Sequence, residues 1–169
     1  MAAATSLPLL YTTADFRELV RAVCAKASIA TSAKLLDNLN DEVQSYEEAI
    51  HSLSQYESAL GKGSFTPTLP KTEEPGRGRA AHSAHEIAAW VHEIMASRGK
   101  TDTFRTDVAC LVSGQIASLN HKIGPYPSIE NYLSAICERS IGNVWIDVDF
   151  QFMNFFYDRP RDNSLCARL

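Results

Sequence analysis

The sequence lacks the features that mark membrane and secreted proteins. No apolar run approaches the roughly 20 residues of a membrane-spanning helix, and the first residues, Met1–Pro8, lack the cationic start of a signal peptide. The four cysteines are scattered and form no Cys-x-x-Cys pair, which favours reduced thiols and synthesis in an intracellular compartment. We therefore expect a protein without a membrane partner.

Catalytic and cofactor-binding motifs are missing as well. The chain has no Gly-x-Ser-x-Gly elbow, no P-loop and no dinucleotide-binding fingerprint. Its five histidines and four cysteines stand at no spacing that demands nucleophilic catalysis. An enzymatic function is unsupported, and no cofactor is expected.

Two groups of residues suggest a metal site at first sight. His82, His85 and Glu86 share one helical stretch but do not form the His-Glu-x-x-His motif. Asp147 and Asp149 resemble an Asp-x-Asp pair, but no third carboxylate or phosphate-binding loop accompanies them. Solvated or paired side chains are the simpler interpretation, so we predict no metal site. A metal-dependent enzyme that uses either group is the alternative.

Length and composition indicate one globular domain, 1–169. The chain is 45% hydrophobic and 21% charged, with a formal net charge of −4. This overall acidity argues against a protein coated in nucleic acid, although a local basic site is compatible with it.

Apolar residues recur at helical spacing through most of the chain. They predict an all-α fold with a helical core over about residues 13–140. Four longer helices and a short fifth are expected: one from Thr12 or Thr13, one from Thr31 or Ser32 to about Leu60, and one each over about 83–98, 104–122 and 129–139.

From Val144 onward the apolar period changes to two. Five apolar residues alternate with aromatic and polar ones as far as Phe152, which predicts a half-buried strand at the start of a C-terminal strand and tail, 144–169. Because one strand cannot stand alone, it should pair with the region of Phe65 or with a neighbouring subunit. Asp147 and Asp149 are expected on its solvent face.

The most basic stretch, Arg98–Asp107, joins the third and fourth helices with three cations and two acids. Gly99 is a plausible end for the helix before it, and Thr103 a plausible N-cap for the helix after it. Two helix ends and a local positive cluster are typical of a binding site for the backbone of a polyanion. A solvated loop between helices is the other interpretation of the same residues.

Short motifs at matching positions resemble those of one family. Within Tyr132–Trp145, the run Glu138-Arg-Ser-Ile-Gly-Asn-Val-Trp145 resembles the C-terminal signature of the tobacco mosaic virus-like coat proteins. Arg105-Thr-Asp107 is similar to the Arg-x-Asp that opens their long RNA-lining helix, and Arg98-Gly-Lys100 to the Arg-x-Arg that closes the helix before it. Shorter matches between Ala14 and Val43 resemble the family's first and second helices.

The resemblance implies an antiparallel four-helix bundle with a small β-sheet at its distal end. It also implies a non-enzymatic coat protein that is made in the host cytoplasm and stacks helically with its own copies around single-stranded RNA to form the virion. The inner loop is shorter than in the tobacco virus protein, and the tail is longer. In this view Arg98, Lys100 and Arg105 meet RNA phosphates without sequence specificity, Asp107 lies beside the RNA, and Lys34 matches a second-helix arginine near it.

Two further expectations accompany the resemblance. Family members place repelling carboxylates across subunit contacts, and Glu42 with Glu86 is our hypothesis for such an intersubunit pair. The alternative function is an RNA-free helical adaptor, which would bind other proteins through its second helix and its C-terminal strand.

Overall fold

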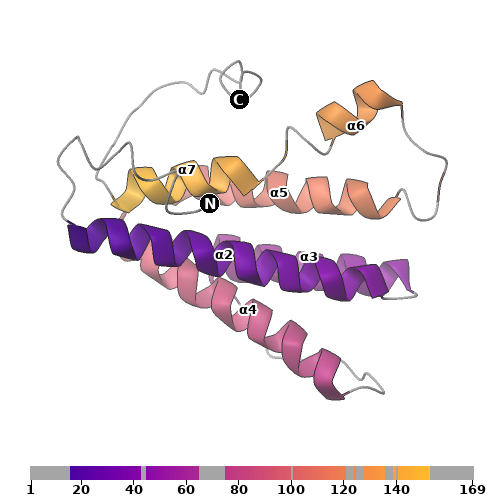
Figure 1. Ribbon diagram of the computed structural model, residues 1–169, viewed down its shortest axis with the longest axis horizontal. Coiled ribbons are helices and arrows are strands. Elements are labelled where there is room, and N and C mark those ends of the chain that lie inside the picture. Colours follow the sequence, from indigo (N-terminus) through magenta and orange to yellow (C-terminus); the bar gives the residue numbers. More distant parts are fainter. Residues whose placement is uncertain are drawn as a thin grey trace.

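The fold is all-α over the residues that the structure describes (Figure 1). The structure is a computed structural model, and it describes residues 16–42, 45–64, 75–99, 101–120, 124, 128–135, 139 and 141–152. These residues form six helices and no strand: α2 (Phe16–Glu42), α3 (Tyr46–Lys62), α4 (Pro75–Ala96), α5 (Asp102–Asn120), α6 (Ile129–Ala135) and α7 (Ile141–Phe152). No helix among them is long and apolar enough to cross a membrane.

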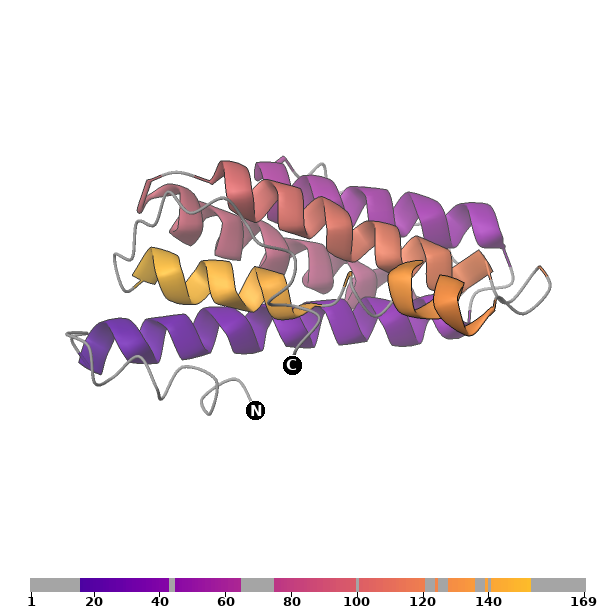
Figure 2. The same ribbon diagram turned by 90° about the horizontal axis from the view of Figure 1, so that it is seen from above.

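Five of the helices pack side by side in a closed ring. Helix α2 packs against α4 and α7, α3 packs against α4 and α5, and α5 packs against α7. Figure 2 shows α2 and α3 on opposite sides of the ring, with the other helices between them. The short helix α6 stands apart from the ring and buries no side chain.

The direction of each helix follows from the contacts near its ends. Arg77 binds Glu42 and Arg98 binds Glu18, so α4 runs antiparallel to α2. His85 faces Ser52 and His92 faces Leu60, so α3 and α4 run parallel. The remaining neighbours in the ring are antiparallel, as Figure 1 shows.

Apolar side chains from all five helices fill the ring. The most deeply buried large residues include Ile29, Leu36, Tyr56, Val108 and Val112. The Tyr56 hydroxyl lies 2.9 Å from the Ser32 Oγ, and this hydrogen bond joins α3 to α2 across the ring. Burial raises the pKa of Tyr56 to about 12, because the phenolate would lose its hydration.

Helix ends follow local chemistry. Ser45 caps α3, its Oγ accepting from the Glu48 amide at 3.4 Å, and Gly63 ends the helix in the left-handed region at φ 64°. Gly99, at φ 131°, follows the end of α4, as predicted. The predicted N-cap at Thr103 is wrong by two residues, since α5 begins at Asp102 and the N-cap position is Thr101.

The predicted strand from Val144 is wrong, because these residues form the helix α7. The buried positions are Val144, Asp147, Val148, Asp149, Gln151 and Phe152, which lie mainly at helical steps of three and four. Ile146 and Phe150, expected to alternate inward, are exposed instead. The proposed pairing partner near Phe65 lies outside the described residues.

Buried charges hold α7 in place, so the expectation of solvated aspartates is also wrong. The Asp149 carboxylate accepts from the Lys26 Nζ at 2.7 Å, and the Lys26 side chain is fully buried. The same Nζ lies 5.9 Å from the centre of the Trp145 ring. An ammonium group away from water needs such partners, and α7 supplies them.

The expected break between the first and second helices is absent. Helix α2 runs unbroken through Thr31 and Ser32, and the next helix begins only at Tyr46. Ser32 does not cap a helix because its hydroxyl is buried and bonds inside the ring, to the Ile29 carbonyl oxygen at 3.1 Å and to Tyr56. The structure therefore differs from the prediction in two ways: the first helix ends at Glu42 and not near Thr31, so the predicted second helix is divided between α2 and α3, and α7 adds a helix.

The apolar spacing predicts buried stripes of Ile87, Trp90, Val91 and Ile94 in α4 and of Ile129, Leu133 and Ile136 over about 129–139. The structure differs from both, and Ile136 lies outside the described residues. In α4 the interior is lined by Ala84, Ala88, Val91 and Met95, whereas Trp90 lies on the outside and is 49% exposed. Helix α6 leaves its expected inward residues Ile129 and Leu133 exposed. By contrast, the predicted stripe of α5 is confirmed, since Phe104, Val108, Leu111, Val112 and Leu119 are all buried.

The pair between Lys26 and Asp149 generates a stability prediction. Asp149→Ala leaves a buried ammonium without its carboxylate, so we expect a loss of about 3–5 kcal/mol in the free energy of unfolding. The double variant Lys26→Met/Asp149→Leu removes both charges and should lose far less. Urea unfolding followed by circular dichroism measures both; a double variant as unstable as the single one would contradict this account.

The contact between the parallel helices α3 and α4 leads to a prediction of how stability depends on pH. Burial lowers the pKa of His85 below its usual 6.5, although hydrogen bonds with the backbone of Ser52 and Ala81 oppose the shift. His85 therefore binds a proton more readily in the unfolded chain than in the folded protein. The stability that neutral His85 contributes is present above pH 6.5 and is lost as the pH falls through the lower pKa of the folded protein.

We expect the free energy of unfolding to fall between about pH 7 and pH 5, and His85→Gln to flatten this dependence. His51→Gln is the matched control, because His51 is an exposed histidine of α3. Equal slopes in the wild type and His85→Gln would contradict the prediction.

Candidate nucleic-acid interface

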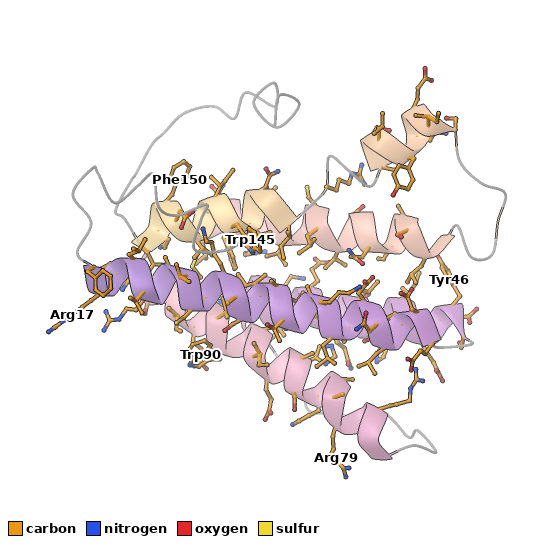
Figure 3. The ribbon with its side chains drawn as sticks, viewed as in Figure 1. Arg17, Tyr46, Arg79, Trp90, Trp145 and Phe150 are labelled. Atoms are coloured by element: carbon orange, nitrogen blue, oxygen red, sulfur yellow. The ribbon has the colours of Figure 1, made fainter. Side chains whose placement is uncertain are left out.

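The predicted basic stretch lies at the end of the ring where α4 ends and α5 begins. The first turn of α2 and the last turns of α3 and α7 lie at the same end. Figure 3 shows Arg17 at this end of α2 and Phe150 near the corresponding end of α7. Five helix ends therefore lie around the candidate site.

Arg98 is held between two other helices. Its Nη2 forms an ion pair with the Oε2 of Glu18 on α2. Its guanidinium carbon lies 4.1 Å from the centre of the Phe152 ring on α7, a stacking distance. The side chain is 20% exposed. Arg98 thus joins α2, α4 and α7, while part of it remains open to solvent.

A neighbouring hydrogen bond strengthens the same junction. The Gln151 side-chain amide of α7 donates to the Met95 carbonyl oxygen of α4 at 3.3 Å. Met95 lies in the last turn of α4, and its carbonyl oxygen also accepts from the Arg98 backbone amide at 3.1 Å. Helix α7 therefore seals the end of α4 directly beneath Arg98.

The Glu18 carboxylate forms ion pairs with two arginines. Its Oε1 accepts from the Arg21 Nη1 at 2.7 Å, while its Oε2 faces Arg98. The Arg21 side chain is 63% exposed. Two cations share one carboxylate, so the cluster of Arg21, Glu18 and Arg98 has a formal charge of +1.

A second group of charges lines an open hollow between the end of α3 and the start of α5. Lys62 and Arg105 are both exposed and stand with Asp102 and Glu57 around this hollow. Gly61 lies against α5, where a Cβ would be 3.5 Å from Val108 Cγ1, an ordinary van der Waals contact. The hollow holds two cations and two acids, with the amino end of α5 beside it.

The other predicted RNA-binding residues do not gather here. Asp107 is 3% exposed, on the inner side of α5 next to Val108, so a contact between its carboxylate and RNA finds no support. Lys34 is exposed on α2 and pairs with Asp37 at 2.6 Å. It lies roughly 24 Å along the helix from Glu18, at 1.5 Å per residue. Lys100 lies outside the described residues.

The predicted intersubunit carboxylates each have a partner within the chain. Glu42 accepts from Arg77 at 3.0 Å, and Glu86 faces the His82 Nε2 at 3.2 Å. Both carboxylates belong to side chains that are at least 60% exposed. They are accessible to another copy, and their meeting across a contact stays a prediction.

Neither of the considered metal groups forms a ligand set. His85 is buried and its Nε2 lies 3.1 Å from the Ser52 carbonyl oxygen, while Asp149 is paired with Lys26. Across the described ranges, no three His, Cys, Asp or Glu side chains converge in a way that could hold an ion.

Comparison with protein-family models, with curated proteins and with solved structures finds no match to this chain. The site must therefore be interpreted from its own residues.

Sequence reasoning missed three residues of this end. Glu18 and Phe152 hold Arg98, and Lys62 lines the same hollow as Arg105. Lys62 had a usable signal, since it precedes Gly63 at a helix end, where cations are favoured. Glu18 and Phe152 had none, because their proximity to Arg98 depends on the packing of α2 and α7.

Proposed function

We propose that this chain is a non-enzymatic structural subunit that assembles with its own copies around single-stranded RNA, as a coat protein does. The observation that carries the proposal is the grouping of cations at one end of the ring: Arg21, Lys62, Arg98 and Arg105, beside the amino end of α5. Contacts of this kind address phosphates and suit RNA of any sequence. In this proposal the virion is where the protein acts, and the host cytoplasm is where it is made.

Arg105 is the residue best placed for a phosphate. It is exposed in the first turn of α5, where backbone amides and the helix dipole favour an anion. Lys62 shares its hollow. The acids Asp102 and Glu57 reduce the local field, so we expect moderate affinity with a clear salt dependence.

Exposed apolar side chains support self-association. Ile129, Tyr132 and Leu133 on α6 and Ile146 and Phe150 on α7 are each between 41% and 79% exposed. Side chains grouped in this way on helix faces are typical of contact surfaces. The antiparallel helical bundle that the coat-protein family implies belongs to this proposal; here the helices α2, α3, α4 and α5 would supply it, with α7 added.

A protein-binding adaptor is the second candidate. It is favoured by the internal position of Arg98, whose ion pair with Glu18 serves the fold without any RNA. The same apolar faces of α6 and α7 would then receive other proteins. A discrete monomer or dimer that never retains RNA would favour this candidate.

The decisive test reverses the charge of Arg105. We expect Arg105→Glu to weaken binding of a single-stranded oligouridylate by about tenfold or more, because one phosphate contact is replaced by repulsion. Fluorescence anisotropy at low salt measures this. Arg79→Glu is the matched control, since Arg79 is an exposed arginine of α4 at the opposite end of the ring.

Electron microscopy of the purified protein provides the second readout. Rods that contain nuclease-resistant RNA in the wild type, and that Arg105→Glu no longer forms, would support the proposal. Equal weakening by Arg79→Glu and Arg105→Glu would show that only net charge matters, and would count against this end of the ring as the site.

The carboxylate hypothesis has its own test. If Glu42 and Glu86 meet between copies, their repulsion opposes assembly and protonation relieves it. Glu42→Gln should then move the midpoint of assembly to higher pH, as measured by light scattering. Glu48→Gln, which removes an exposed acid of α3, is the control; an unchanged midpoint in Glu42→Gln would sink the hypothesis.

A further inference from the structure

We propose that Glu18 is an internal competitor for the anion site at Arg98, which a phosphate-bearing polyanion displaces when it binds. The inference rests on the proposed function, because it concerns how that same end of the ring takes up RNA. It assigns a regulatory role to Glu18, a residue of α2 to which the sequence analysis gave no role at the site.

The two sides of the Arg98 guanidinium are held by different kinds of contact. The ring of Phe152 covers one face at 4.1 Å, and the carboxylate of Glu18 occupies the edge at Nη2. Stacking orients the plane of the group without using its N–H donors. The edge is the part that recognises carboxylates and phosphates alike, in the same fork geometry. A phosphate that uses this edge must therefore replace Glu18.

The Glu18 carboxylate would keep its ion pair with Arg21 after Arg98 is released. Glu18 Oε1 already pairs with the Arg21 Nη1 at 2.7 Å, and this contact does not involve Arg98. Loss of the Arg98 contact leaves Oε1 paired with Arg21, whereas Oε2, which has almost no exposed surface beside Arg98, must turn toward water. The Glu18 and Arg98 side chains are 24% and 20% exposed, so both reach the surface where this exchange would take place.

The charge of the cluster favours the exchange. Arg21, Glu18 and Arg98 together carry +1, so an arriving phosphate meets a net attraction even while Glu18 is in place. Glu18 lowers the affinity without abolishing it. The contact between α2 and α4 is correspondingly weakened in the bound state, since the two equilibria are linked.

The test compares two variants that each remove one negative charge near this end. Glu18→Gln removes the competitor, whereas Glu93→Gln removes an exposed acid of α4 that has no contact with Arg98 among the interactions of the described residues. Affinity for a fluorescent single-stranded oligouridylate is measured by anisotropy with the full chain. We expect Glu18→Gln to bind about threefold to tenfold more tightly than the wild type, and Glu93→Gln to change much less.

A third variant locates the gain. In the Glu18→Gln/Arg98→Gln double variant the increase should disappear, because the site that Glu18 blocked is gone. Circular dichroism of each variant verifies that the helices remain folded. A gain that survives without Arg98 would overturn the inference.

The remaining outcomes separate this inference from the proposed function. Equal gains in Glu18→Gln and Glu93→Gln would reflect net charge alone and would overturn the inference, while RNA binding itself would stand. A folded Glu18→Gln that binds no better than the wild type would overturn it as well. Absence of binding in the wild type and in every variant would overturn both.

Discussion

The ion pair between Lys26 and Asp149 is the interaction on which the rest of the structure depends. It joins α2 to α7 with a fully buried ammonium group, and a charge in that position excludes any register of α7 that leaves it unpaired. With the register fixed, Val144 and Val148 close the ring, Phe152 arrives beneath Arg98, and Gln151 reaches the Met95 carbonyl oxygen. The candidate site therefore owes its geometry to a contact in the interior and not to the basic stretch alone.

The number of helices in the ring imposes a second constraint. Five elements around a closed ring cannot all alternate in direction, so one neighbouring pair must be parallel, and here it is α3 and α4. Parallel neighbours align their dipoles unfavourably. This seam is also where His85 and His92, seven residues apart and so on one face of α4, contact the carbonyl oxygens of Ser52 and Leu60. Side-chain contacts to backbone thus occur where the helix directions are least favourable, and they make the seam sensitive to pH.

The sequence predicted correctly the features that depend on residues close together in the chain. The apolar stripe of α5 and the stop at Gly99 could be predicted because each depends on residues within one or two turns. Residues 144–152 could not, since their apolar residues alternate as in a strand, and the helical pattern emerges only when Asp147, Asp149 and Gln151 are counted as buried. That requires a cation in the core, and Lys26 stands 123 positions away in the sequence from Asp149. The partners of Arg98 were missed for the same reason.

Helix α2 continues past the expected break near Thr31, and this changes which part of the coat-protein resemblance can support a function. Its upstream matches were expected on two successive helices, but those within 16–42 lie on one continuous helix, so they have no structural counterpart of the expected kind. The turn between α4 and α5 keeps the expected form, with Gly99 after one helix and Arg105 in the first turn of the next. Arg98, however, already contacts Glu18 and Phe152, so among the described residues the more exposed cations near this turn are Arg105 and Lys62. If the proposed function holds, a polyanion that approaches this end would meet those two first and reach Arg98 only by exchange, so that binding would be a stepwise process governed by the packing of α2 and α7.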